Sequence, residues 1–169
     1  MIGRAMLILG GARSGKTRRA LAIGGPFPER FYIATAEALD AEMADRIARH
    51  RRERGEDWTT AEAPIDLPAA IAALPGGSVG IVDCLTLWLS NVMGSGREVA
   101  GATEELLLAI GACPATLVVI SNEVGLGLVP DTPLGRAFRD EQGRLNQAVA
   151  AIVPEVEFVA AGLPLRLKP

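Results

Sequence analysis

Residues 10–17 read Gly10-Gly11-Ala12-Arg13-Ser14-Gly15-Lys16-Thr17. This stretch fits the pattern G-x-x-x-x-G-K-[ST] at every fixed position. The apolar residues 6–9 before it have the length of a buried strand, and residues 18–23 after it are typical of the start of a helix. In this arrangement the glycines let several N–H groups converge on one phosphate, and the helix adds its positive end. The alternative is a glycine-rich turn with a chance lysine.

Two side chains of this loop have predicted tasks in phosphate chemistry. Lys16 is expected to reach the β- and γ-phosphates of a nucleotide, and the Thr17 hydroxyl to hold Mg²⁺. A carboxylate is expected on the opposite side of the metal, and Asp83 fits because it directly follows the apolar residues 79–82. Apolar runs often end in aspartate, so this assignment depends on its pairing with the loop.

Composition limits the classes of protein to consider. The chain has 169 residues and is 49% hydrophobic, which predicts a single domain over residues 1–169 with a substantial core. A net charge of −3 gives no broad basic surface for nucleic acid, and no apolar run reaches the length of a membrane span. The cysteines Cys84 and Cys113 show no metal-ligand spacing, so we expect a reduced, cytoplasmic protein in which Cys84 is a small buried thiol.

The order of elements predicts an α/β fold. Nearly all-apolar runs at residues 6–9, 31–34, 79–82, 117–121 and 156–160 read as strands covered on both faces, with helical stretches between them. Helices are expected at residues 40–55, 102–110 and 134–152, and another is expected to end at residues 75–77. The alternation implies a mostly parallel sheet flanked by helices on both faces, with right-handed crossovers. Residues 165–168 alternate apolar and basic and could form an edge strand.

Ligands of parallel α/β sheets lie at the carboxyl ends of the strands, so the residues that follow each strand are candidates. After residues 31–34 come Thr35, Ala36 and Glu37. The strand at residues 117–121 leads into Asn122 and Glu123. Glu123 could act on a nucleophile or a water molecule, or it could cap a helix. The sequence leaves these readings open.

The helix expected at residues 40–55 is rich in arginine. Asp40 is a plausible N-cap and Gly55 a plausible residue after the C-terminus. His50 is the single histidine of the chain and is surrounded by five arginines between residues 46 and 54. These cations disfavour imidazolium, leave a neutral nucleophilic ring and gather phosphates. The alternative, a solvated arginine-rich helix with an incidental histidine, stays open on the residues alone.

Seven blocks of the chain together closely resemble one enzyme family. They are GGARSGKT (10–17), YIATA (32–36), DAEMADRIARHRRER (40–54), WTTAEAP (58–64), VDCLTLWLSN (82–91), SNEVGLGLVP (121–130) and FRDEQGRLN (138–146). In this order they resemble the bifunctional adenosylcobinamide kinase / adenosylcobinamide-phosphate guanylyltransferases of cobalamin biosynthesis. The loop at residues 10–17 is shared with many families, whereas the other blocks are specific.

The resemblance implies two reactions. The family phosphorylates the aminopropanol hydroxyl of adenosylcobinamide with ATP or GTP in the presence of Mg²⁺. It then transfers GMP from GTP to the new phosphate through a GMP-histidine intermediate, and only His50 can match that histidine here. The family fold is a P-loop NTPase domain with a RecA-like sheet, and its members look like homotrimers.

The resemblance also implies the site residues. The catalytic residues would be His50 and Lys16, and the metal ligands Thr17 and Asp83. The nucleotide would be bound by Gly10, Gly11, Ala12, Arg13, Ser14, Gly15, Lys16, Thr17, Ala34, Thr35, Ala36, Arg51, Arg52, Glu53, Arg54, Glu62 and Asp83. Two other functions compete with this one: a P-loop kinase of another small molecule, with His50 structural, and a nucleotide-controlled RecA-like binding module whose output is assembly.

Overall fold

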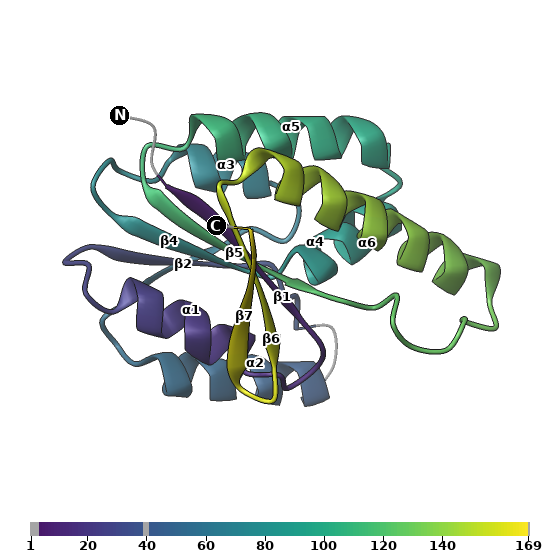
Figure 1. Cartoon of the computed structure of the whole chain (residues 1–169), viewed down its shortest axis with the longest axis horizontal. Coiled ribbons are helices and arrows are strands. Elements are labelled where there is room, and N and C mark those ends of the chain that lie inside the picture. Colours follow the sequence, from purple (N-terminus) through teal and green to yellow (C-terminus); the bar gives the residue numbers. More distant parts are fainter. Residues whose placement is uncertain (1–3, 39–40, 169) are drawn as a thin grey trace.

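The computed structural model of the chain describes residues 4–38 and 41–168. In chain order its elements are β1 (Ala5–Gly10), α1 (Lys16–Gly24), β2 (Arg30–Ala34), α2 (Ala41–Arg54), β3 (Thr59–Glu62), α3 (Leu67–Ala72), β4 (Val79–Asp83), α4 (Leu85–Ser95), α5 (Val99–Ala112), β5 (Thr116–Asn122), α6 (Pro133–Ile152), β6 (Glu155–Ala160) and β7 (Leu163–Lys168). Helices cover both sides of one sheet (Figure 1). No helix in the described ranges combines the length and the apolarity needed to cross a bilayer.

The sheet has the strand order β3-β2-β4-β5-β1-β6-β7. Every neighbouring pair is parallel except β6 and β7, which run antiparallel. The predicted α/β class and mostly parallel sheet are therefore confirmed. The tail strand expected at residues 165–168 is also confirmed, since β7 forms one edge of the sheet.

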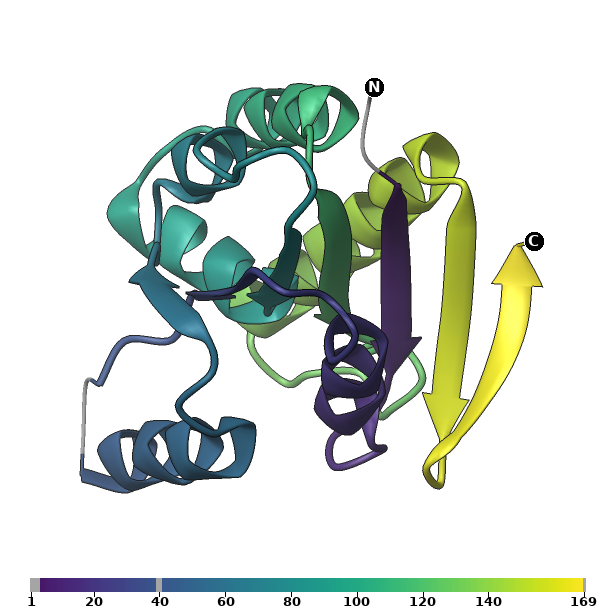
Figure 2. The same ribbon diagram turned by 90° about the vertical axis from the view of Figure 1, so that its left-hand side faces the viewer.

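Two apolar layers hold the helices to the sheet. Leu7 and Leu9 of β1 face one layer, in which α3, α4, α5 and α6 pack. Met6 and Ile8 face the other layer, which contains Ala20 of α1. This alternation explains why all six residues of β1 are buried and why its sequence is wholly apolar apart from Gly10. Figure 2 shows α1 and α2 on one side of the sheet and α3 to α6 on the other.

Three features differ from the sequence predictions. Strand β3 was not predicted, because Thr59–Glu62 is short and polar and forms the other edge of the sheet. Helix α4 was not predicted either, because Leu85–Ser95 is apolar on several sides and shows a weak helical period. Helix α5 includes the predicted residues 102–110 but extends beyond them at both ends. The predicted helix at residues 40–55 corresponds to α2, and Gly55 has the positive φ of a C-terminal glycine. The predicted cap Asp40 lies outside the described residues.

Candidate active site

A cavity of about 1140 Å³ opens at the carboxyl ends of β1, β2, β4 and β5. This is the edge of a parallel sheet where ligands are expected. The walls come from the glycine loop, the ends of the strands and helix α2. The lining residues are Ala12, Arg13, Ser14, Gly15, Lys16, Thr17, Tyr32, Ala34, Ala36, Asp45, Ile47, Arg51, Arg52, Arg54, Asp83, Cys84, Leu87, Ile120 and Asn122.

The glycine loop is held in a tight conformation by its own backbone and by the turn between β6 and β7. Gly15 has a φ of +102°, which side chains rarely tolerate. A Cβ on Gly10 would lie 2.5 Å from the Val159 carbonyl oxygen. The Gly162 N–H donates to the Ser14 carbonyl at 2.8 Å. The Ser14 hydroxyl is buried and has no hydrogen-bond partner in the described part of the chain. A phosphate oxygen in the loop would supply the missing partner.

Lys16 begins α1 and is almost wholly buried. Its Nζ donates to the Gly11 carbonyl at 2.6 Å, so the ammonium lies over the loop. Burial lowers the pKa of Lys16, and the electrostatic interactions with Cys84 and Asp83 raise it, which offsets part of that effect. A desolvated cation over a phosphate-binding loop is poised to interact strongly with an incoming anion, because the interior screens it less than water does.

Asp83 connects three elements of the site. The Thr17 hydroxyl donates to Asp83 Oδ2 at 3.1 Å, and the Tyr32 hydroxyl donates to the same oxygen at 2.5 Å. Burial, together with the charge of Asp83, raises the pKa of Tyr32 well above its usual range, so that the phenol remains a donor. A carboxylate and a hydroxyl side by side at the cavity wall are hard oxygen ligands of the kind that Mg²⁺ prefers, so these residues fit the metal.

Three arginines of α2 line the cavity from the side opposite the loop. The Arg54 guanidinium stacks 3.9 Å from the centroid of the Tyr32 ring and donates to the Thr60 hydroxyl at 2.9 Å. Arg51 lines the cavity and forms an ion pair with Glu62, which does not line it. The wall therefore carries an excess of positive charge suited to a polyphosphate. The side chains of His50 and Glu53 lie outside the described part of the structure.

The structure thus brings most of the predicted nucleotide-binding residues to the cavity wall, but Gly10, Gly11, Thr35 and Glu62 are not among the residues that line it. Thr35 is fully buried below the cavity. Its hydroxyl donates to the Cys84 carbonyl at 2.7 Å and accepts from the Cys84 N–H at 2.8 Å. It therefore ties the end of β2 to the end of β4, while its neighbours Ala34 and Ala36 reach the cavity wall. Cys84 is buried as predicted, and burial raises its pKa to about 11, which keeps it a thiol.

Sequence reasoning missed three polar residues of the wall, Tyr32, Asp45 and Asn122. Tyr32 lies inside an apolar strand and read as a core residue. Asn122 follows β5 at a position where only Glu123 was considered. Asn122 could have been predicted from the alternation of side chains along a strand. Ile120 and Asn122 are two residues apart and therefore share the face of β5 that is turned toward α1 and the cavity.

Glu123 lies next to the loop. Its N–H donates to the Gly10 carbonyl at 3.1 Å, and its Oε1 accepts from Asn146 Nδ2 at 3.3 Å. The carboxylate is therefore held from α6, and none of these contacts is that of a helix cap.

Comparisons with known proteins agree with this site. Residues 6–167 match the family model "Cobinamide kinase / cobinamide phosphate guanyltransferase". The chain is 45% identical over 166 residues to the bifunctional adenosylcobalamin biosynthesis protein CobP of Pseudomonas aeruginosa, and the match covers 96% of each chain. It is 37% identical over 179 residues to the corresponding protein CobU of Salmonella typhimurium, covering 96% of this chain and 99% of that one.

A solved structure supports the fold alone. The P4 protein from bacteriophage phi6, in complex with ADP, superposes with a TM-score of 0.52 at 14% identity, covering 95% of this chain and 52% of that one. This similarity concerns the arrangement of the sheet and its helices. The family match over nearly the whole described chain, together with relatives at 37% and 45% identity, assigns the family. This chain belongs to the cobinamide kinase / cobinamide phosphate guanyltransferase family.

Proposed function

We propose that this chain performs the two reactions of its family at the one cavity described above. It is a bifunctional enzyme of cobalamin biosynthesis that acts as adenosylcobinamide kinase and as adenosylcobinamide-phosphate guanylyltransferase. The observation that supports a shared cavity is that the glycine loop and the arginines of α2 line the same space. One triphosphate could therefore contact both.

The kinase step relies on the loop and the strand ends. The N–H groups of residues 10–17 would cradle the β- and γ-phosphates of ATP or GTP, with Lys16 over the bridge where negative charge builds up. Thr17 and Asp83 would hold Mg²⁺, which neutralises phosphate charge when bound. Tyr32 keeps the Asp83 carboxylate oriented through the hydrogen bond to Oδ2. The acceptor would be the hydroxyl of adenosylcobinamide.

The guanylyl transfer relies on α2. Positions 47, 50, 51 and 54 share one face of an α-helix, and the described side chains of this set, Ile47, Arg51 and Arg54, line the cavity. We propose that His50 attacks the α-phosphorus of GTP, that pyrophosphate leaves, and that the acceptor phosphate then takes GMP from the imidazole. Imidazole suits this role because it attacks phosphorus well and forms a labile bond.

A labelling experiment tests this assignment. After incubation with α-labelled GTP, the wild-type protein should carry an acid-labile GMP adduct, and His50→Ala should carry none. The variant should still phosphorylate adenosylcobinamide, because Lys16, Thr17 and Asp83 are intact. Adenosylcobinamide phosphate should then accumulate. Continued labelling of His50→Ala would assign the nucleophile to another residue, and loss of both activities in a folded variant would contradict the division of labour.

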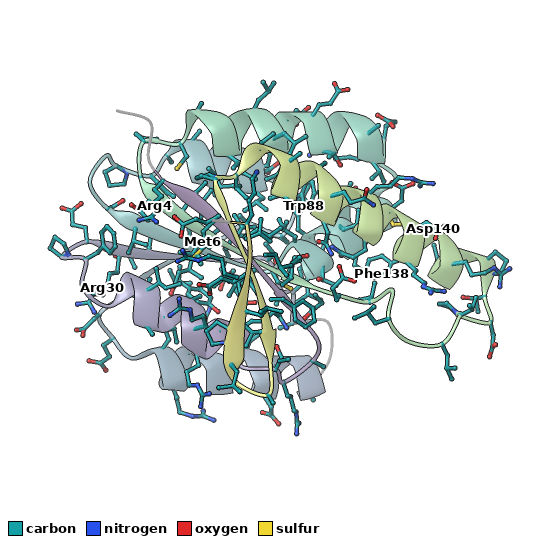
Figure 3. The ribbon with its side chains drawn as sticks, viewed as in Figure 1. Arg4, Met6, Arg30, Trp88, Phe138 and Asp140 are labelled. Atoms are coloured by element: carbon teal, nitrogen blue, oxygen red, sulfur yellow. The ribbon has the colours of Figure 1, made fainter. Side chains whose placement is uncertain are left out.

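We further propose a single-domain cytoplasmic enzyme that assembles as a homotrimer. The loop between β5 and α6 extends away from the sheet (Figure 1), beside Phe138 and Asp140 near the beginning of α6 (Figure 3). It exposes Leu126, Leu128 and Val129, with Leu128 96% exposed in the single chain. Contact between copies would remove such apolar side chains from water. Analytical ultracentrifugation should give three times the chain mass, and a monomer would contradict this part.

A further inference from the structure

A cluster of buried polar side chains connects α6 to the end of β5. Ser121, Gln142 and Asn146 are buried, although the same layer is otherwise filled by Leu117, Val119, Leu145 and Val149. Burying three polar side chains costs free energy unless they are hydrogen-bonded to one another. Their contacts show what the cluster holds in place.

The hydrogen bonds fix the direction of one amide. Asn146 Oδ1 accepts from the Ser121 hydroxyl at 2.6 Å and from Gln142 Nε2 at 2.9 Å. Because both partners donate to the oxygen, the amide nitrogen must point the other way. Asn146 Nδ2 donates to the Asn122 carbonyl at 3.2 Å and to Glu123 Oε1 at 3.3 Å. The buried cluster therefore orients one oxygen of the Glu123 carboxylate. Oε2 accepts no hydrogen bond from the residues that the structure describes.

The position of Glu123 follows from the strand order. Strand β5 lies between β4, which ends in Asp83, and β1, which leads into the glycine loop. A nucleotide held by Lys16 and by the Thr17–Asp83 pair would place its terminal phosphate near the end of the strand between them, β5. Asn122 at that point lines the cavity, whereas Glu123 is not among the lining residues. The Glu123 N–H is bonded to the carbonyl of Gly10 at the start of the loop, and its carboxylate is held by Asn146 on the α6 side of β5. Glu123 is thus an oriented carboxylate whose backbone lies next to the phosphate-binding loop.

We propose that Glu123 is a catalytic residue of the kinase step and that Asn146 is its positioning residue. The inference rests on the proposed function. As the acceptor oxygen forms its bond to the γ-phosphorus, the bond from that phosphorus to the β–γ bridging oxygen breaks, and the nucleoside diphosphate leaves with the electron pair. The hydroxyl proton passes to Oε2 of Glu123 and from there to water.

The second reaction does not need this group. Its acceptor is a phosphate monoester, which carries a charge of about −1.5 to −2 at pH 7 and has no proton that must be removed before attack. The proposal therefore predicts a loss confined to one of the two steps. A residue that only stabilised the fold or bound the nucleotide would affect both.

The test compares Glu123→Gln with wild type in two separate assays. The kcat for phosphorylation of adenosylcobinamide should fall roughly 10²- to 10⁴-fold, the usual contribution of general acid–base catalysis. The KM for the nucleotide should change by less than about twofold. Transfer of GMP to supplied adenosylcobinamide phosphate should also stay within about twofold, because no proton is taken from that acceptor. Glu123→Asp should keep more kinase activity than Glu123→Gln, since it retains a carboxylate.

Two further variants complete the experiment. Asn146→Ala should lower kcat for the kinase step about tenfold, with little change in KM, through misorientation of Glu123. Glu104→Gln, at an exposed position of α5, is the matched control and should behave as wild type. Full kinase activity of Glu123→Gln, or equal losses in both assays with an unchanged melting temperature, would overturn the inference. Absence of kinase activity in the wild-type protein would instead reject the proposed function.

Discussion

Helices α1 and α2 line the same cavity, and each is anchored by an arginine–glutamate pair. In α1, Arg19 makes a two-pronged contact with Glu157 of β6, with both nitrogens 2.8 Å from the carboxylate oxygens. In α2, Arg51 pairs with Glu62 of β3. The Glu157 side chain is 6% exposed, whereas that of Glu62 is 67% exposed. The same two residue types therefore form a largely buried ion pair in α1 and a solvent-exposed ion pair in α2.

The difference shows how the two walls of the site are built. Helix α1 also buries Ala20 and Gly24 against the sheet and Trp58, so the phosphate-binding loop sits on a rigid support. None of the described side chains of α2 is fully buried, and its contacts to the rest of the chain include the exposed Arg51 pair and the stacking of Arg54 on Tyr32. Exposed ion pairs contribute little to stability, because water and salt screen them. We infer that the loop supplies fixed geometry and that α2 supplies charge.

The largest expected effect is a loss of kinase activity at the wall formed by α1, with no loss of stability. Lys16→Ala should lower the rate of adenosylcobinamide phosphorylation at least roughly a hundredfold, as for removal of one preorganised electrostatic group. Because burial already lowers the pKa of Lys16 and so disfavours its charge, the melting temperature should not fall. Steady-state kinetics and calorimetry on the same sample check this. Near-normal turnover in a folded variant would contradict the role.

An intermediate effect is expected for the buried pair. Glu157→Gln should destabilise the fold by about 1–2 kcal/mol at pH 7, less than for a fully buried pair because the Arg19 side chain is 36% exposed. The hydrogen bond from Arg19 is the main reason that the pKa of Glu157 lies below its ordinary value of 4.5. The stabilisation is therefore present above pH 4.5 and is lost as the pH falls through the lower folded-state pKa. Urea unfolding of both proteins across this pH range measures it; a constant difference would be the contrary result.

The smallest effect is expected for the matched substitution in the exposed pair. Glu62→Gln should change the free energy of unfolding by less than about 0.5 kcal/mol, and the small difference should shrink further in high salt. Urea unfolding at low and high ionic strength is the measurement. A loss as large as that of Glu157→Gln would mean that α2 is anchored as firmly as α1, and the distinction between the two walls would fail.

The sequence predicted the parts of the molecule that carry strong local signals. The loop at residues 10–17, the carboxylate of Asp83 and the apolar central strands follow from pattern alone, because each needs particular residues at fixed spacing. Strand β3 was missed because four residues at a sheet edge, three of them polar, have no such signal. Tyr32 was missed as part of the site because its hydroxyl reaches Asp83 only once β2 and β4 are paired. The tertiary arrangement, and not the local sequence, brings Tyr32 to the cavity wall.

The place of β1 in the sheet has a consequence for how the chain is made. Both neighbours of this strand, β5 and β6, follow it by more than about a hundred residues in the chain. At roughly 5–20 residues per second, a ribosome needs on the order of 5 to 20 seconds to supply the first of them. During that time a six-residue apolar strand has no native partner and is open to association with other chains. Correct assembly of the nucleotide site therefore depends on keeping its first strand shielded until its last strands emerge.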